Sequence, residues 1–394
     1  MRVLLLAQKL PLPKEDGYNL RLHHLVPRLA ERHAVHLLAL DSGRMCPALE
    51  QSFASVRVVV DRERPPAPAL GSLARSWSGR GLMDVDPAVG AAIRERLAAE
   101  AFDAVWVSGW RLAPHAAALD APPVLGDVID EGSAEDWADL LRCRRRWLLP
   151  GLLRRWWRTR AFERRYFRRF AACSVVGERD AAALRRLLPG LEVTVVPNGV
   201  DARHFAPGPE DRRRGAPTLV FEGAMSFAPN REAALFLARR VMPRLRRAVP
   251  GAQLLLVGRD PDEAVRALAG PDVEVTGFVE DVRPWLDRAW VFVSPLLGGT
   301  GIKNKVLQAW AMAKPVVATP AGLAGLAVEP GRNAVVAEGA KGLASACARL
   351  LGDPPARKRI GAEGRRTVLE RYSWDASARE LESILQRIAK GKRG

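Results

Sequence analysis

Short apolar segments alternate with longer segments of helical periodicity along most of the chain. In the first half, apolar runs at Val3–Ala7, Ala104–Val107 and Val124–Ile129 are separated by helical stretches such as Leu20–Glu31. Strands that alternate with helices predict a parallel sheet covered by helices on both faces. The sequence therefore predicts an α/β chain of two Rossmann-like, doubly wound domains, because the second half repeats the pattern with strands expected at 218–222, 253–257, 273–276, 290–294, 315–318 and 334–337.

The stretch Pro197–Pro217 has the composition of a linker, since prolines and glycines flank a charged tract there. We therefore expect an N-terminal domain at residues 1–196 and a C-terminal domain at residues 197–372. The tail at 373–394 is expected to be helical. A length of 394 residues agrees with two or three domains.

Composition excludes several classes of protein. The four cysteines show no CxxC spacing, which argues against a disulfide scaffold or a zinc module and favours a reducing cytoplasm. The first apolar run is too short for a signal peptide or a membrane span, and no apolar stretch of 18 residues follows it. The formal net charge of +17 favours anionic partners: phosphorylated ligands, an anionic membrane surface or nucleic acid.

A turn rich in glycine and lysine follows the expected strand at 290–294. Gly298, Gly299 and Gly301 relax the backbone, and Lys303 and Lys305 supply cations where a helix is expected to begin. The free N–H groups of a helix N-terminus already favour an anion, so the turn predicts a diphosphate site. Its spacing is not that of a P-loop. The alternative is a solvated basic turn.

A second turn glycine, Gly17, precedes the helical stretch Leu20–Glu31. A glycine there lets the backbone approach a phosphate at the helix N-terminus. The GxGxxG fingerprint is absent, and a purely structural role is the commoner one for a single turn glycine.

Seven motifs in a fixed order carry a resemblance to a known family. The chain resembles the GT-B glycosyltransferases of family 4, and most of all their exopolysaccharide-associated branch, the PEP-CTERM/exosortase-linked sugar transferases. The tail Tyr372–Trp374 is similar to the segment that crosses back onto the N-terminal domain in this fold. The motifs are Pro197–Asp201, Phe221–Met225, Leu256–Arg259, Val275–Val279, Ser294–Leu296, Gly299–Ala309 and Lys314–Thr319.

The resemblance implies a GT-B fold, with the two domains facing across a cleft. It implies a retaining transfer of a sugar from a nucleotide diphosphate donor, which lies mainly on the second domain, to a glycan or lipid-linked acceptor that meets the first. Helix N-termini and lysines would stabilise the leaving group, so we expect no catalytic metal and no cofactor besides the donor.

The resemblance also implies roles for single residues. Gly277, Phe278 and Val279 match the segment that pinches the nucleobase, Gln308 stands where the family has a glutamate that holds the ribose hydroxyls, and Thr300 stands at the donor-sugar end of the same Glu-x7-Glu pair. The remaining donor-binding set comprises Gly17, Gly223, Arg259, Gly301, Lys303, Asn304 and Lys305, with Lys305 near the diphosphate and Gly17 facing the donor phosphates from the first domain.

Two departures from the family pattern affect the expected activity. Thr300 and Gln308 are both neutral, and an amide accepts a hydroxyl hydrogen bond more weakly than a carboxylate does. The family's Arg/Lys pair after the first strand of the second domain is missing, since Ala224 and Asn230 occupy that region. Lys303, Lys305 and Arg259 would then neutralise the diphosphate. A non-catalytic homologue that binds nucleotide, or that scaffolds a synthesis complex, is the alternative.

Two aspartates of the first domain, Asp127 and Asp130, are expected to face the cleft and to orient the acceptor hydroxyl or the donor sugar. The alternative is helix capping by Asp130 and Ser133. With Thr300 and Lys305, these two aspartates complete the predicted catalytic set.

The segment 142–169 is strongly basic and aromatic, with twelve arginines and one acid, Glu163. Cationic helices with Trp and Leu bind anionic lipid headgroups, so we predict one basic helix at the membrane. The alternative is a helix whose aromatic side chains pack on the first domain. No nucleic-acid-binding fold signature accompanies the segment, and no nucleic acid partner is expected. The sequence thus predicts a cytoplasmic enzyme, peripheral on the inner membrane face, in surface polysaccharide synthesis.

Overall fold

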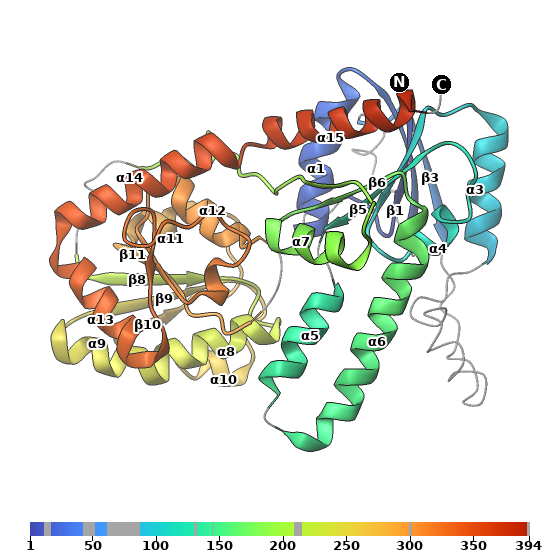
Figure 1. Ribbon diagram of the computed structural model, residues 1–394. Helices are drawn as coiled ribbons and strands as arrows, with labels where there is room; N and C mark the ends of the chain where they lie inside the picture. The colour runs from blue at the N-terminus through green and yellow to red at the C-terminus, as the bar shows by residue number, and fades with distance from the viewer. Residues whose placement is uncertain are drawn as a thin grey trace. The chain divides into compact units, whose positions relative to one another are not determined.

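The computed structural model describes residues 1–11, 17–41, 52–60, 87–129, 132–143, 145–208, 215–298 and 302–391. The chain divides into two compact units (Figure 1). Unit 1 comprises Met1–Pro197 together with Asp375–Gly394, and unit 2 comprises Asn198–Trp374. The C-terminal tail therefore belongs to the same unit as the N-terminal residues.

The sheet of unit 1 has the order β3-β2-β1-β4-β5-β6-β7, and all its described pairings are parallel. Its central strands are apolar on both faces, as the sequence pattern predicts for a sheet with helices on both sides. The strands are β1 (Arg2–Ala7), β2 (Ala34–Asp41), β3 (Ser55–Val60), β4 (Ala104–Ser108), β5 (Val124–Ile129), β6 (Ala172–Val175) and β7 (Val193–Val195).

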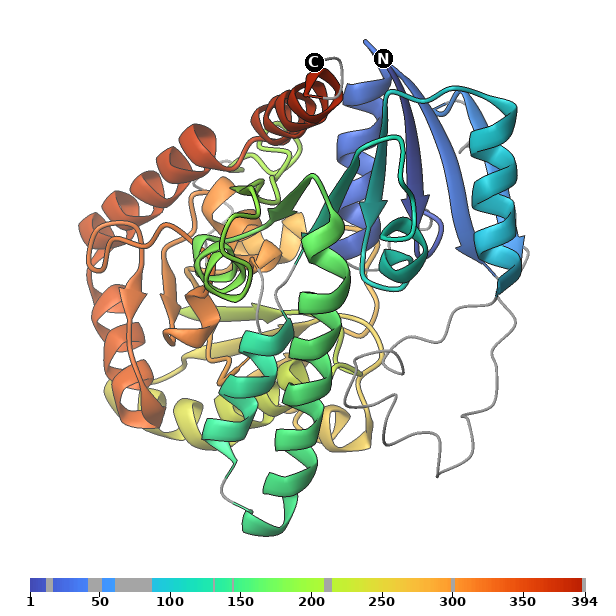
Figure 2. The ribbon, with the colours of Figure 1, turned by 45° about the vertical axis from the view of Figure 1, so that its right-hand side comes forward.

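Helices cover both faces of this sheet. Side chains of α3 and α7 pack on the face that carries Leu4, Leu6 and Val105. In Figures 1 and 2, α1 lies on the other side of the strands from α3. The described helices are α1 (Gly17–Ala30), α3 (Pro87–Ala99), α4 (Ala113–Ala116), α5 (Gly132–Arg142), α6 (Leu149–Tyr166), α7 (Glu178–Leu187) and α15 (Trp374–Lys390).

The last helix, α15, is bound to unit 1 by charge and by apolar contact. Glu382 accepts a hydrogen bond from His33 at 2.8 Å, and Asp375 pairs with Arg28 at 2.6 Å. One face of the helix is apolar and buried, with Leu381, Ile384, Leu385 and Ile388.

The sheet of unit 2 has the order β10-β9-β8-β11-β12-β13, again parallel throughout. The strands are β8 (Thr218–Glu222), β9 (Gln253–Val257), β10 (Val273–Val275), β11 (Val291–Ser294), β12 (Val316–Ala318) and β13 (Val335–Val336). The helices are α8 (Ala228–Phe236), which continues through a π-helical turn at Leu237–Val241 into α9 (Met242–Ala248), then α10 (Glu263–Arg266), α11 (Arg283–Arg288), α12 (Asn304–Ala311), α13 (Gly339–Gly352) and α14 (Pro354–Arg371).

Each sheet has one point where its strand order reverses. In unit 2 the chain runs outward from β8 through β9 to β10, and then returns to β11 on the other side of β8. In unit 1 the reversal lies between β1 and β4. Ligands of doubly wound sheets bind outside the carboxyl ends of the strands at such a switch point. The prediction of two doubly wound α/β domains is confirmed, and the predicted facing of the domains stays a prediction.

The helix predicted over the basic segment 142–169 is shorter in the structure. Helix α5 ends at Arg142, a 3-10 turn occupies Arg146–Leu148, and α6 begins at Leu149. Pro150 lies in the first turn of α6, where a proline starts a helix but cannot continue one from before it. The two helices run side by side as a hairpin (Figure 2).

Candidate functional site

Beside the switch point of unit 2, two neighbouring strand ends that carry glycine come together. Gly223 follows β8 and Gly258 follows β9, with φ of 153° and 146°. A Cβ on Gly258 would lie 2.0 Å from the carbonyl oxygen of Gly223, so no larger residue fits between these loops.

The ammonium of Lys305 lies at the end of β8. Lys305 is in the first turn of α12, and its Nζ donates a hydrogen bond to Oδ1 of Asn230 at 2.7 Å. The same Nζ is 4.7 Å from the ring centroid of Phe221 and 2.7 Å from the place that a Cβ on Gly223 would take. A cation from one strand-to-helix turn thus reaches the end of the neighbouring strand.

Asn230 holds that ammonium in place. Its Nδ2 donates to the carbonyl of Ala224 at 2.9 Å, which leaves Oδ1 to accept from Lys305. Sequence reasoning recorded Asn230, with Ala224, only as a residue in the region where the family's Arg/Lys pair is missing. The structure shows that the amine from α12 reaches the same loop.

Burial shifts the pKa values of two side chains at this site toward neutral pH. It lowers the pKa of Lys305 to about 8, with Lys303 acting in the same direction and Glu222 opposing it. Burial raises the pKa of the Glu222 carboxyl to about 7, and Lys305 opposes that rise. An ammonium that has lost much of its water beside a helix N-terminus is suited to an anionic ligand.

The other predicted donor residues lie in loops at the same edge of the sheet. Lys303 is buried directly before α12, and Oδ1 of Asn304 accepts from Asn198 at 3.4 Å. Arg259 follows β9 and pairs with Asp260 at 3.7 Å.

The loop after β10 and the rest of α12 complete that edge. Gly277, Phe278 and Val279 follow β10, with 72% of Phe278 exposed. Gln308 is half-buried on α12, almost one turn beyond Lys305. Three predicted residues, Thr300, Gly301 and Asp130, lie outside the described residues.

Gly17 is the first residue of α1, beside the switch point of unit 1. The adjoining strand ends are joined by Tyr18. Its hydroxyl donates to the carbonyl of Ser108 at 3.1 Å and accepts from the backbone N–H of Gln8 at 3.0 Å. Burial raises the pKa of this hydroxyl, so it acts as a fixed neutral donor.

Asp127 forms an internal ion pair. Its two oxygens accept from Nε and Nη2 of Arg21 at 2.9 Å each, and both side chains are fully buried. Ser174 donates to the same carboxylate at 2.8 Å, and Nη1 of Arg21 reaches the carbonyl of Val196. These contacts join α1, β5 and β6. The predicted contact of Asp127 with a substrate stays a prediction that none of these bonds supports.

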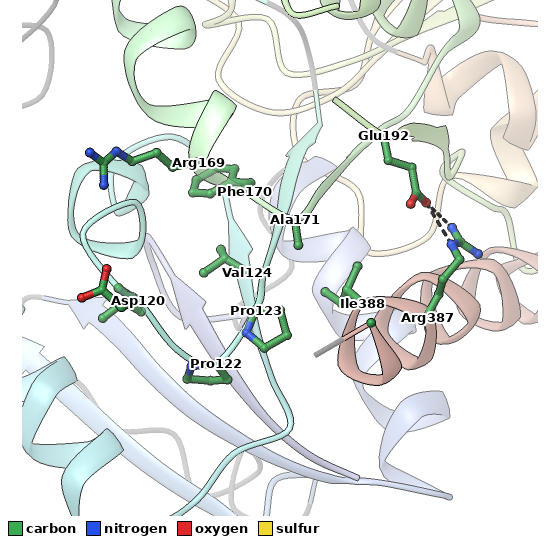
Figure 3. Close-up of a pocket in the computed structure, with 12 residues that line it drawn as sticks. Asp120, Pro122, Pro123, Val124, Arg169, Phe170, Ala171, Glu192, Arg387 and Ile388 are labelled. Carbon is green, nitrogen blue, oxygen red and sulfur yellow. Dashed lines mark hydrogen bonds and ion pairs between the residues drawn. The ribbon is translucent and has the colours of Figure 1, made fainter. Parts of the chain in front are cut away.

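A pocket of about 420 Å³ lies elsewhere in unit 1, at the opposite edge of its sheet (Figure 3). Its walls come from the segments that precede β5, β6 and β7 and from the end of α15. Glu192 and Arg387 pair with each other at one side of it. Of the predicted site residues that the structure describes, none lines this pocket.

The α5–α6 hairpin is held by polar contacts along its length. Glu163 accepts the backbone N–H of Gly132 at 3.0 Å, and Asp136 accepts from Thr159 at 2.6 Å. Arg155 of α6 pairs with Asp136 and Asp139 of α5 at 2.6 Å each.

Apolar side chains are exposed around the closed end of the hairpin. The exposed fraction is 73% for Trp147 and 71% for Leu141. Arg145 and Arg146 are exposed beside them. Within the described residues, no helix is long and apolar enough to cross a membrane.

Sequence models of two families match consecutive parts of the chain. Residues 16–199 match the family described as glycosyl transferase 4-like domain, and residues 216–353 match glycosyl transferases group 1. The chain is built from the two domains of a family 4-like GT-B glycosyltransferase.

Curated relatives of this GT-B chain include mannosyltransferases and glycogen synthases. It is 32% identical over 213 residues to a GDP-mannose-dependent monoacylated alpha-(1-6)-phosphatidylinositol monomannoside mannosyltransferase of Corynebacterium glutamicum, a match that covers 48% of this chain and 55% of the relative. It is 27% identical over 209 residues to the phosphatidyl-myo-inositol mannosyltransferase of Mycolicibacterium smegmatis, covering 51% of this chain and 53% of the relative. The chain thus spans about half the length of these relatives.

Solved structures confirm the GT-B fold. Sucrose-phosphate synthase from Thermosynechococcus elongatus superposes with a TM-score of 0.74 at 18% identity, covering 99% of this chain and 100% of that one. Anabaena HepE in complex with UDP and glucose gives 0.69 at 16% identity, with coverage of 98% and 100%.

Sequence reasoning missed two residues of the switch point. Asn230 binds Lys305, and Glu222 is a buried carboxylate beside it. The available signal was a glutamate directly before a glycine at the end of the first strand of the second domain.

Proposed function

We propose that the protein transfers a sugar from a nucleotide diphosphate donor, bound at the switch point of unit 2, to a glycan or lipid-linked acceptor. The observation that carries this proposal is the Lys305 ammonium, which lies at the end of β8 beside the N-terminus of α12. The fold, the family matches and relatives whose names include GDP-mannose support it.

In this proposal the chain stabilises the nucleoside diphosphate as it leaves the sugar. Lys305, Lys303 and the first N–H groups of α12 meet the charge that develops on the diphosphate. The transfer is proposed to retain the anomeric configuration and to need neither a metal ion nor a cofactor. The acceptor hydroxyl is then held on the same face of the donor sugar.

The acceptor is proposed to be reached at an anionic membrane, in surface polysaccharide synthesis at the inner membrane face. The closed end of the α5–α6 hairpin supports this, because exposed Trp147 and Leu141 stand beside exposed arginines. Aromatic and apolar side chains enter the headgroup layer, and arginines bind its anionic lipids.

A nucleotide-binding protein without turnover is the second candidate, favoured by the neutral residues at 300 and 308. Thermal shift of the full chain with UDP, GDP, ADP and their sugar conjugates tests the first step. We expect one nucleotide to raise the melting temperature by mass action. Slow hydrolysis of the matching nucleotide sugar then separates an enzyme from a binding protein.

Lys305→Ala should weaken binding of the effective nucleotide by at least about 10-fold, because the diphosphate loses a desolvated cation. Lys341→Ala is the matched control, since Lys341 is an exposed lysine of α13 in the same unit. Equal affinities for wild type and Lys305→Ala would show that the donor binds elsewhere.

A further inference from the structure

Glu222 is a buried carboxylate at the switch point of unit 2. It is the last residue of β8, and only 8% of it is exposed. In the described part of the chain no hydrogen bond reaches its carboxylate, and the nearby ammonium of Lys305 donates to Asn230 instead. A carboxylate that receives no hydrogen bond from the chain can accept hydrogen bonds from a ligand.

Burial affects the protonation of the group. Burial raises the pKa of Glu222 to about 7, although the ammonium of Lys305 opposes the rise. A ligand that donates hydrogen bonds would counter this rise by stabilising the charged form.

The two family positions that supply carboxylates to donor hydroxyls are neutral in this chain. Residue 300 is a threonine and residue 308 is a glutamine. Glu222 ends the strand β8, and α12, which carries Gln308, follows the neighbouring strand β11. A carboxylate is therefore present at the same edge of the sheet, but it comes from a different element.

Resting on the proposed function, we propose that Glu222 accepts hydrogen bonds from a hydroxyl pair of the donor, on the ribose or on the transferred sugar. Both sugars flank the diphosphate that Lys305 would hold, so both lie within reach of a group beside Lys305. The ligand chemistry is a vicinal diol next to a diphosphate. Glu222 supplies the charged acceptor that Gln308 lacks.

The negative charge of Glu222 affects the two parts of the donor in opposite directions. A carboxylate repels the phosphates of the donor while it attracts the hydroxyls. Removing its charge should therefore weaken ligands that carry the hydroxyls and leave plain pyrophosphate as tight as before, or tighter. A residue that only supports the position of Lys305 would weaken both kinds of ligand when it is changed.

Titration calorimetry of the full chain tests the inference with wild type, Glu222→Gln and the control Glu232→Gln, an exposed glutamate of α8. The probes are pyrophosphate, the tighter of UDP and GDP, its 2′,3′-dideoxy analogue, and the matching nucleotide sugar. We expect Glu222→Gln to bind the hydroxyl-bearing ligand about 10-fold more weakly, with pyrophosphate binding not weakened.

The probes also identify which sugar is bound. A ribose contact predicts a loss for the nucleoside diphosphate and none for its dideoxy analogue. A contact with the transferred sugar predicts a loss for the nucleotide sugar alone. Glu222→Asp keeps the charge and should recover part of the lost affinity, and it carries the test if Glu222→Gln does not fold.

Two results would overturn the inference while the proposed function stands: equal affinities of wild type and Glu222→Gln for every probe, or a parallel loss for pyrophosphate. If wild type binds neither UDP nor GDP, the proposed function fails and the inference falls with it. The wild-type titrations alone distinguish that case from the other two.

Discussion

Single residues at the unit 2 switch point are tuned to titrate close to neutral pH. Lys305 is charged below its pKa of about 8 and neutral above it. Glu222, with a pKa of about 7, gains its negative charge over the same rise in pH. Loss of the Lys305 charge removes attraction for a diphosphate, whereas the charge on Glu222 repels the diphosphate and attracts the donor hydroxyls. Above pH 8 Glu222 is already charged, so Lys305 decides how affinity changes there.

Affinity for a nucleotide sugar should therefore fall as pH rises through about 8, by up to about 10-fold per pH unit once Lys305 is neutral. A nucleotide sugar is the right probe, because its diphosphate does not titrate in this range. Calorimetry between pH 7 and pH 9.5 gives the profile. Lys305→Met should bind weakly with little dependence on pH above 8. A steep profile in that variant would assign the titration to another group.

The charge of Asp127 is engaged in a buried ion pair with Arg21 that stabilises unit 1. Asp127→Asn leaves the guanidinium of Arg21 buried without its counter-charge, which costs about 3–5 kcal/mol of unfolding free energy. Chemical denaturation followed by fluorescence measures the loss. Replacing both partners, as in Arg21→Met with Asp127→Leu, should recover much of it. A catalytic Asp127 would instead give Asp127→Asn normal stability and no turnover.

At the scale of elements, the α5–α6 hairpin shows what periodicity can and cannot predict. The strands were recognisable because both faces of a central parallel strand are buried, which leaves short continuous apolar runs. The helix predicted over 142–169 is α6 with a 3-10 turn at each end, and its start is marked by local geometry and by Pro150. The stabilising pairs of the hairpin, such as Arg155 with Asp136, join residues that no sequence period relates.

The closed end of the hairpin, more than its paired arginines, should govern membrane binding. Trp147→Ser combined with Leu141→Ser should lower partitioning into phosphatidylglycerol vesicles by about 10-fold or more, because both side chains lose apolar burial. Vesicle sedimentation measures it, with Leu369→Ser of α14 in unit 2, another exposed leucine, as control. Equal partitioning of the double variant and wild type would leave the hairpin a structural element.

At the scale of the whole molecule, α15, which begins at Trp374, completes a unit that begins at Met1. Leu381→Ala removes a fully buried side chain of α15 and should cost about 2–5 kcal/mol. Hydrogen exchange should quicken in the sheet of unit 1 and stay unchanged in that of unit 2. Glu380→Ala, on the exposed face, is the control. Faster exchange in unit 2 alone would contradict the assignment of α15 to unit 1.

The motif order placed Lys305 near a diphosphate, but no spacing could bring its amine to Asn230. That contact spans 75 residues and depends on how β8 and β11 become neighbours. Glu222 escaped notice for the same reason, since its burial is a property of the assembled sheet. Sequence thus specifies which loops meet at the switch point, and packing decides which side chains meet within it.

Because α15 belongs to unit 1, the order of synthesis on the ribosome determines which unit can finish folding first. Unit 2 is, in effect, an insertion between the two pieces of unit 1. Because synthesis runs from the N-terminus, all of Asn198–Trp374 has been made before Leu381 and Leu385 leave the exit tunnel. The nascent unit 1 therefore keeps an uncovered apolar face until α15 emerges. The unit whose synthesis begins first completes its folding last.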